Sequence, residues 1–331
     1  MKKIALISTG GTIASKVDEK TGKLMAGEQT GEELLSKCNL NSKGLCNRVQ
    51  VVVRSLYQIP SNQMSFEKNI NLFKVMKQMA AEENCDGFVV THGTDTLEES
   101  AYFLSLLWDL DIPLVITGSQ YSPTENNTDA FHNITNALIV ASSDDSRGLG
   151  VLVSFNDRIF TARYVTKIHA SNINGFGAPR NGPIGIVDEG HVHYFSRPFL
   201  NKTYRIGDKL PNVEIIKEYM DMDNSIIDYY VSRGASGLIV EAFGRGNTTL
   251  GTAERIKSAI EKGVIVVITT SCPDGEVAPV YGYKGGLNDL LMMGAISGHD
   301  YTSKKARIKL MVLLASGITN KNDIQIEFDK N

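Results

Sequence analysis

What this sequence of 331 residues lacks excludes several classes of protein. No run of apolar residues approaches the roughly 20 that a membrane-spanning helix needs, so we expect no membrane partner. The formal net charge is −3 at pH 7, so basic residues are not in excess and we expect no nucleic-acid partner. Nothing requires the four cysteines to pair, and their spacing is not that of metal ligands, so we expect no metal site. They are Cys38, Cys46, Cys85 and Cys272.

Two further motifs are missing. The first residues, MKKIALISTGG, contain an apolar run of only about four residues, whereas a signal peptide needs about seven or more. The segment GGTIAS lacks the third glycine and the downstream acid of a dinucleotide-binding fingerprint, and the chain has no phosphate-binding loop. We therefore expect a cytoplasmic protein that uses no cofactor.

What is present indicates two α/β domains. Apolar residues make up 42% of the chain and charged residues 21%, as in soluble globular proteins. Short apolar segments typical of buried strands alternate with helical patterns, which favours mainly parallel sheets covered on both faces. We expect strands at 4–7, 51–53, 87–90, 114–117, 151–155, 213–216, 237–242 and 264–269. We expect helices at 97–110, 129–141, 225–231, 252–261 and 304–315.

The alternation lapses near 193–210 and then resumes. The sequence therefore predicts two doubly wound domains, a larger one at 1–193 and a smaller one at 212–331, joined by a linker at 194–211. The length of the chain also suits two domains rather than one.

Two segments with the same design stand out within the first domain. A predicted strand at 87–90 is followed by THGTDT and a helical pattern, and a predicted strand at 4–7 is followed by STGGT. Each segment places a threonine, Thr94 or Thr12, next to glycine at the carboxyl end of a buried strand, where open α/β sheets bind their ligands. One such threonine is usually only a helix cap, but two together indicate a site.

The segments TGGTIA and THGTDTLEE resemble the two signature motifs of the bacterial-type L-asparaginases, the asparaginase/glutaminase family. The resemblance continues through PLVITGSQ, RYVTKIHAS, EAFGRGN and the C-terminal helix, so it covers nearly the whole chain. It implies an amidohydrolase that converts L-asparagine and water to L-aspartate and ammonia, with possible weaker action on glutamine. The expected absence of a signal peptide places the chain closer to the cytoplasmic branch.

The resemblance also implies the catalytic residues. Thr12 is the expected nucleophile, and Thr94, Asp95 and Lys167 are expected to form a second catalytic set that moves protons. A threonine hydroxyl is a weak nucleophile, so it needs a neighbouring base or charge and donors for the developing oxyanion. Backbone N–H groups near Gly11 and Thr94 are the expected donors.

Substrate-binding residues follow from the same motifs. Asp95 is expected to face the α-ammonium group of the substrate. Ser61 matches the family residue that binds the α-amino-acid group, whereas Asn62 is shorter than the Gln or Glu that follows it in relatives. The main chain of Ser119 is expected to hold the carboxamide. Asn247 matches an asparagine that reaches the site from a neighbouring subunit, which implies a homo-oligomer, most simply a tetramer.

Three features differ from the periplasmic members of the family. The segment 15–27 occupies the position of a mobile lid, but Leu24 stands where those enzymes carry a tyrosine. We match no residue in the region after Cys272 to the glutamate that those enzymes send into a partner's site. Two tyrosines, Tyr281 and Tyr283, occur in that region instead. Because Tyr283 begins a Tyr-x-x-Gly segment, we expect it to be the catalytic tyrosine, although Tyr281 remains an alternative.

Two other functions stay open at this point. The chain could be a non-catalytic amino-acid-binding or sensing protein, which Leu24 and the missing glutamate favour. It could also be the ammonia-donating subunit of a tRNA-dependent amidotransferase. That subunit carries an additional N-terminal domain, whereas the strand before TGGT begins here at residue 4, so we expect this alternative to be weaker.

Overall fold

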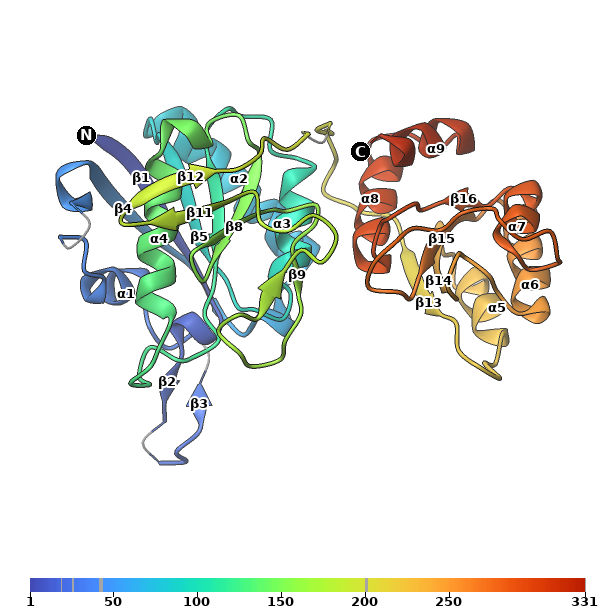
Figure 1. Cartoon of the computed structure of the whole chain (residues 1–331), viewed down its shortest axis with the longest axis horizontal. Coiled ribbons are helices and arrows are strands. Elements are labelled where there is room, and N and C mark those ends of the chain that lie inside the picture. Colours follow the sequence, from blue (N-terminus) through green and yellow to red (C-terminus); the bar gives the residue numbers. More distant parts are fainter. Residues whose placement is uncertain (19, 26, 42–43, 200–201, 331) are drawn as a thin grey trace. The chain divides into compact units, whose positions relative to one another are not determined.

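The computed structural model describes the chain except residues 19, 26, 42–43, 200–201 and 331. It divides into two compact units, Met1–Thr203 and Tyr204–Asn331, which we describe separately (Figure 1). None of the described helices combines the length and the apolar composition that crossing a membrane requires.

The first unit is built on an eight-stranded sheet in the order β12-β11-β8-β7-β6-β5-β1-β4. Five neighbouring strands, from β7 to β4, are parallel, and the remaining three are antiparallel. The strands are β1 (Lys2–Gly10), β4 (Val49–Ile59), β5 (Gly87–Thr91), β6 (Leu114–Thr117), β7 (Val151–Phe155), β8 (Arg158–Thr161), β11 (Gly185–Asp188) and β12 (His191–Tyr194).

Helices cover both faces of this sheet. On one face α1 (Gly31–Lys37) and α4 (Ala130–Ser142) pack over a core that includes Ile4, Leu6 and Val89. On the other, α2 (Phe66–Glu82) and α3 (Leu97–Ser105) pack over a core that includes Ala5 and Ile7. Because successive residues of a strand point to opposite faces, β1 is apolar at every position from Ile4 to Ile7.

The order of the parallel strands positions a ligand site. The chain runs from β1 to β4 on one side and then returns to β5 on the other side of β1. The loops that leave β1 and β5 therefore diverge to opposite faces, and the gap between them is where open α/β sheets bind ligands. The Thr12 segment follows β1 and the Thr94 segment follows β5.

Smaller elements lie outside this sheet. A two-stranded hairpin, β2 (Lys16–Val17) with β3 (Leu24–Met25), follows the Thr12 segment, and a second pairs β9 (Thr166–Lys167) with β10 (Phe176–Gly177). Short 3-10 helices in the described part of this unit span Thr12–Ala14, Leu45–Asn47, Ser61–Gln63 and Asp144–Ser146.

The second unit is a smaller parallel sheet with the order β13-β14-β15-β16. Its strands are β13 (Val213–Lys217), β14 (Gly237–Ala242), β15 (Ile265–Thr270) and β16 (Ile296–Ser297). Its helices are α5 (Ser225–Ser232), α6 (Leu250–Glu261), α7 (Leu287–Met293), α8 (Ser303–Ala315) and α9 (Lys321–Asp329). Buried residues of α5, α6 and α7 share one core with β13, β14 and β15.

The predicted fold class, two mainly parallel α/β domains with the larger one first, is confirmed. Several details were wrong. The helix expected at 97–110 ends at Ser105, and a further helix, α9, follows the one expected to be last. The antiparallel edge strands were not expected. The two-residue turn between β7 and β8 has positive φ at Asn156 (47°) and Asp157 (62°), the conformation that closes a tight hairpin.

Candidate active site

The two threonine segments meet at the carboxyl edge of the sheet. Ser8 of β1 pairs with Thr91 of β5, so both strands end side by side. Gly11 has φ +85°, and a Cβ built on it would lie 2.2 Å from the Cα of Gly93. The backbones of the two segments are therefore in direct contact, and a side chain at Gly11 would separate them.

Lys167 joins the second segment from β9. Its Nζ donates hydrogen bonds to Thr94 Oγ1 at 2.8 Å and to Asp95 Oδ1 at 2.7 Å. The Lys167 side chain is 18% exposed and that of Asp95 is 66% exposed, so the lysine is largely desolvated while the carboxylate reaches solvent. The three residues expected to form the second catalytic set are thus brought together.

Ser61 is hydrogen-bonded to the loop that carries Thr94 and Asp95. Its Oγ accepts a hydrogen bond from the Asp95 N–H at 3.2 Å, and its carbonyl accepts one from Thr96 Oγ1 at 2.7 Å. Thr96 is the N-cap residue of α3, but its hydroxyl binds Ser61 instead of capping the helix. Ser61 is buried. Its hydroxyl oxygen accepts the bond from Asp95, so its hydroxyl hydrogen is not used in that bond. The neighbouring Asn62 is exposed.

Backbone donors are available beside both threonines. The Gly11 N–H is used, because it donates to the Ile59 carbonyl at 2.9 Å. In the described part of the chain, no hydrogen bond takes up the amide N–H of Thr12 or of Thr94. Thr12 itself is partly exposed, at the start of a 3-10 helix. The two segments therefore offer the unused N–H groups of Thr12 and Thr94 as hydrogen-bond donors, and solvent reaches Thr12.

Ser119 follows β6 at the same edge. A Cβ on the preceding Gly118 would lie 3.5 Å from Thr94 Cγ2, so the two loops are neighbours. The Ser119 hydroxyl donates to the Tyr121 carbonyl at 2.7 Å, which removes its side chain from the site and leaves its main chain as the relevant part.

The expected lid at 15–27 includes residues 19 and 26, which lie outside the described residues. The rest forms the β2–β3 hairpin, with Leu24 49% exposed. The base of the hairpin is fixed, because the Ser15 carbonyl accepts hydrogen bonds from Gln29 Nε2 at 2.8 Å and from Ser122 Oγ at 3.1 Å. The Ser15 hydroxyl donates to the Gly11 carbonyl at 3.1 Å.

Asn247 and Tyr283 belong to the second unit, and the structure holds their loops together. Asn247 closes a tight turn through reciprocal backbone hydrogen bonds with Phe243. The next residue, Thr248, donates its N–H to the Gly285 carbonyl at 2.8 Å, two residues beyond Tyr283. Tyr281 and Tyr283 stack with ring centroids 5.4 Å apart, and both are about half exposed.

Two buried residues near the site were not assigned a catalytic role from the sequence. His92 donates from Nδ1 to the Gly93 carbonyl at 2.8 Å, and burial lowers its pKa below the ordinary value. Glu98, in the first turn of α3, accepts the backbone N–H of Lys167 at 2.9 Å. The sequence alone does not indicate that this glutamate, within a helical pattern, accepts a hydrogen bond from a residue 69 positions later.

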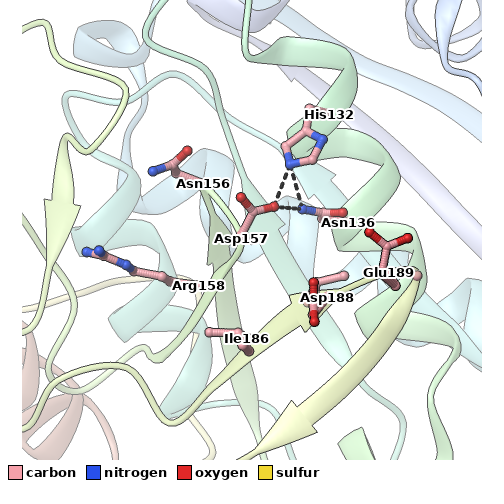
Figure 2. A pocket seen from close by; sticks show the side chains of 10 residues that line it. His132, Asn136, Asn156, Asp157, Arg158, Ile186, Asp188 and Glu189 are labelled. Atoms are coloured by element: carbon pink, nitrogen blue, oxygen red, sulfur yellow. Dashed lines mark hydrogen bonds and ion pairs between the residues drawn. The ribbon is translucent and has the colours of Figure 1, made fainter.

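A pocket on the same unit is lined by none of the predicted site residues (Figure 2). It has a volume of about 450 Å³ and lies between α4 and the turns of the antiparallel strands. At its rim Asp157 Oδ1 accepts hydrogen bonds from His132 Nε2 at 2.5 Å and Asn136 Nδ2 at 2.8 Å. Within the described residues, its carboxylates and histidine do not form a group able to hold a metal ion.

The edge of the sheet thus carries two threonine hydroxyls, a desolvated lysine paired with a carboxylate, and unused backbone donors. These are the groups of a hydrolase that works through a side-chain hydroxyl. Comparisons with known proteins identify the family to which the chain belongs. The family model "Asparaginase, N-terminal" matches residues 3–200, and "Glutaminase/Asparaginase C-terminal domain" matches residues 212–328. The chain belongs to the asparaginase/glutaminase family, as the sequence motifs predict.

Individual relatives agree. The chain is 44% identical to an L-asparaginase of Bacillus licheniformis over 97% of this chain and 98% of that one. It is 32% identical to one subunit of the glutamyl-tRNA(Gln) amidotransferase of Methanosarcina acetivorans, over 95% of this chain and 74% of the relative. The crystal structure of a probable cytoplasmic L-asparaginase from Campylobacter jejuni superposes with a TM-score of 0.88 at 28% identity, covering 100% of both chains.

Proposed function

We propose that this protein is an L-asparaginase, which hydrolyses the side-chain amide of L-asparagine through an acyl-Thr12 ester and acts more weakly on L-glutamine. The observation that carries the proposal is the bridge from Lys167 Nζ to both Thr94 Oγ1 and Asp95 Oδ1. This bridge lies beside the contact between Gly11 and Gly93, on a chain related over nearly its full length to an L-asparaginase.

In the first step, the Thr12 hydroxyl oxygen attacks the carboxamide carbon. The resulting oxyanion is stabilised by unused backbone donors such as the N–H groups of Thr12 and Thr94. The C–N bond then breaks, and the proton lost by the Thr12 hydroxyl goes to the leaving nitrogen, which departs as ammonia. The product of this step is an ester between Thr12 and the β-carboxyl group of aspartate.

In the second step, water attacks the ester carbonyl and releases L-aspartate and the Thr12 hydroxyl. Thr94 relays a proton in this step: its Oγ1 takes one from the water while its own hydroxyl proton passes to the departing Thr12 oxygen, and the hydrogen bond from Lys167 Nζ holds Oγ1 for this exchange. The pairing of Lys167 with Asp95 offsets the cost of keeping the lysine in a largely dry environment.

The α-amino-acid group of the substrate is held by charge complementarity. The exposed face of the Asp95 carboxylate binds the α-ammonium group. Ser61 directs its free hydroxyl hydrogen to the α-carboxylate, with Asn62 beside it. The carbonyl of Ser119 receives the carboxamide N–H, and Gly11 lets the backbone approach the substrate closely.

We further propose that Asn247 and Tyr283 complete the site of a partner subunit in a homotetramer. Exposed apolar side chains support an interface at the carboxyl edge of the second sheet. They follow three consecutive strands: Tyr219 and Met220 after β13, Phe243 after β14, and Val280, Tyr281 and Tyr283 after β15. A second copy of this chain is the proposed occupant, and sedimentation of an active monomer at assay concentration would contradict it. The likeness to a probable cytoplasmic relative supports a cytoplasmic location.

The test is ammonia release from L-asparagine in a coupled assay with the purified chain alone, with L-glutamine measured in parallel. We expect turnover of both amides, with the higher kcat/KM for L-asparagine. Binding of L-asparagine without ammonia release would instead identify the sensing protein that Leu24 first suggested. Ammonia release without any added partner would count against an amidotransferase subunit.

A further inference from the structure

Lys167 lies on an element with little support of its own. Its strand, β9, has two residues and, among the residues that the structure describes, pairs only with the two-residue strand β10, outside the eight-stranded sheet. Yet the Nζ atom of Lys167 must stay within hydrogen-bond distance of two atoms of the loop after β5. A lysine side chain has four rotatable bonds, so its main chain must be fixed if the amine is to be fixed.

Glu98 supplies this second point of attachment. Its Oε2 accepts the backbone N–H of Lys167 at 2.9 Å, and the residue is only 4% exposed. Glu98 lies in the same short segment as the two residues that Lys167 Nζ contacts. Thr94 comes four residues before Glu98 in the sequence, and Asp95 comes three residues before it. One segment therefore holds Lys167 at both ends, by its backbone N–H and by its side-chain amine.

We propose that Glu98 is a positioning residue for Lys167, which holds the lysine main chain so that Nζ bridges Thr94 and Asp95. The inference rests on the proposed function for the meaning of Lys167 in catalysis. Glu98 is buried and is not among the residues that we propose to bind the substrate. Its location also suits it to this role, because a carboxyl group in the first turn of a helix is stabilised by the helix dipole and stays in place.

The test compares three variants of the full-length protein in the L-asparagine assay. Glu98→Gln keeps an oxygen acceptor of the same shape, Glu98→Ala removes it, and Glu99→Ala removes a carboxyl group from the same helical turn as a matched control. We expect Glu98→Ala to lower kcat by about 10- to 100-fold with little change in KM, since displacement of a catalytic group by about 1 Å costs roughly this much.

Glu98→Gln is expected to retain kcat within about threefold, and Glu99→Ala to match the wild type, because neither removes the acceptor for the Lys167 N–H. A purely structural role would lower kcat and stability and raise KM together, and would not leave KM unchanged. Wild-type kcat in Glu98→Ala would overturn the proposal, and so would a Gln variant as impaired as the Ala variant.

A crystal structure of Glu98→Ala separates this inference from the proposed function. We expect Lys167 Nζ to leave hydrogen-bond distance of Thr94 Oγ1 in that structure. If Nζ stays in place, the positioning role is wrong, whether or not the wild type hydrolyses asparagine. If the wild type releases no ammonia but Nζ moves, the proposed function fails and the positioning role stands.

Discussion

The backbones of Gly11 and Gly93 touch, so that a Cβ on Gly11 would lie 2.2 Å from the Cα of Gly93. Each glycine belongs to one of the two threonine segments, and their contact sets how near Thr12 and Thr94 can come. The conformation of Gly11, at φ +85°, is one that residues with a side chain rarely adopt. The contact with Gly93 and the positive φ of Gly11 lead to separate predictions.

Gly11→Ala is expected to lower kcat by at least about 100-fold, because the new methyl group pushes the segments apart. Gly263 has the same φ of +85° with nothing within 4 Å of its Cβ position, so Gly263→Ala is the control for a side chain at positive φ without a backbone contact. It is expected to lose about 1–2 kcal/mol in urea unfolding and no kcat. Equal losses of kcat in both variants would show that strain, not the contact, is responsible.

The two threonines are expected to have different roles. Thr12→Ala removes the nucleophile and Thr94→Val removes the acceptor for Lys167, so each variant should lose turnover while still binding L-aspartate in calorimetry. Thr12→Ser, which keeps a hydroxyl, is the control and should retain measurable activity. A Thr12→Ala enzyme with a tenth of the wild-type kcat would remove Thr12 as the nucleophile.

Tyr283 is expected to supply the hydroxyl that Leu24 cannot. Tyr283→Phe should lower kcat by about 100-fold or more, the loss expected when a positioned acid–base group is removed. The stacking against Tyr281 survives this change, so the variant isolates the hydroxyl. Leu24→Ala is expected to raise KM mainly, by loosening the lid. Wild-type turnover in both Tyr283→Phe and Tyr281→Phe would refute the idea that a tyrosine compensates.

His92 is expected to make stability depend on pH. Burial lowers its pKa in the folded state below the ordinary value of 6.5. Above that pH the imidazole is neutral in both states, and below it only the unfolded chain gains the proton. The folded protein therefore loses stability as the pH falls from 6.5 toward the lower folded pKa, by up to about 1.4 kcal/mol per pH unit.

His92→Asn removes this titration and retains a donor near the position of Nδ1, which bonds the Gly93 carbonyl. Urea midpoints at pH 7.5, 6.5 and 5.5 should fall less for the variant than for the wild type. Parallel pH profiles would mean that His92 takes up its proton as readily in the folded protein as in the unfolded chain.

The sequence by itself determined the class of fold, because alternating apolar strands and amphipathic helices leave few arrangements other than covered parallel sheets. It also indicated the two loops that we propose to carry the chemistry, since the Thr12 and Thr94 segments each follow a buried strand directly. Local signals of this kind act over a few residues. They were weaker for the edge strands, where the hairpin turn at Asn156 and Asp157 uses residues that are common in any loop.

Only the tertiary structure decided which side chains meet. Strand order brought β1 beside β5, and with it Gly11 against Gly93. The place of Lys167 depends on an acceptor, Glu98, that lies 69 residues earlier in the chain. Hydrogen bonds of such range follow from how the elements pack and not from periodicity. The sequence therefore indicated candidate residues for the site, and packing determined which of them contact one another.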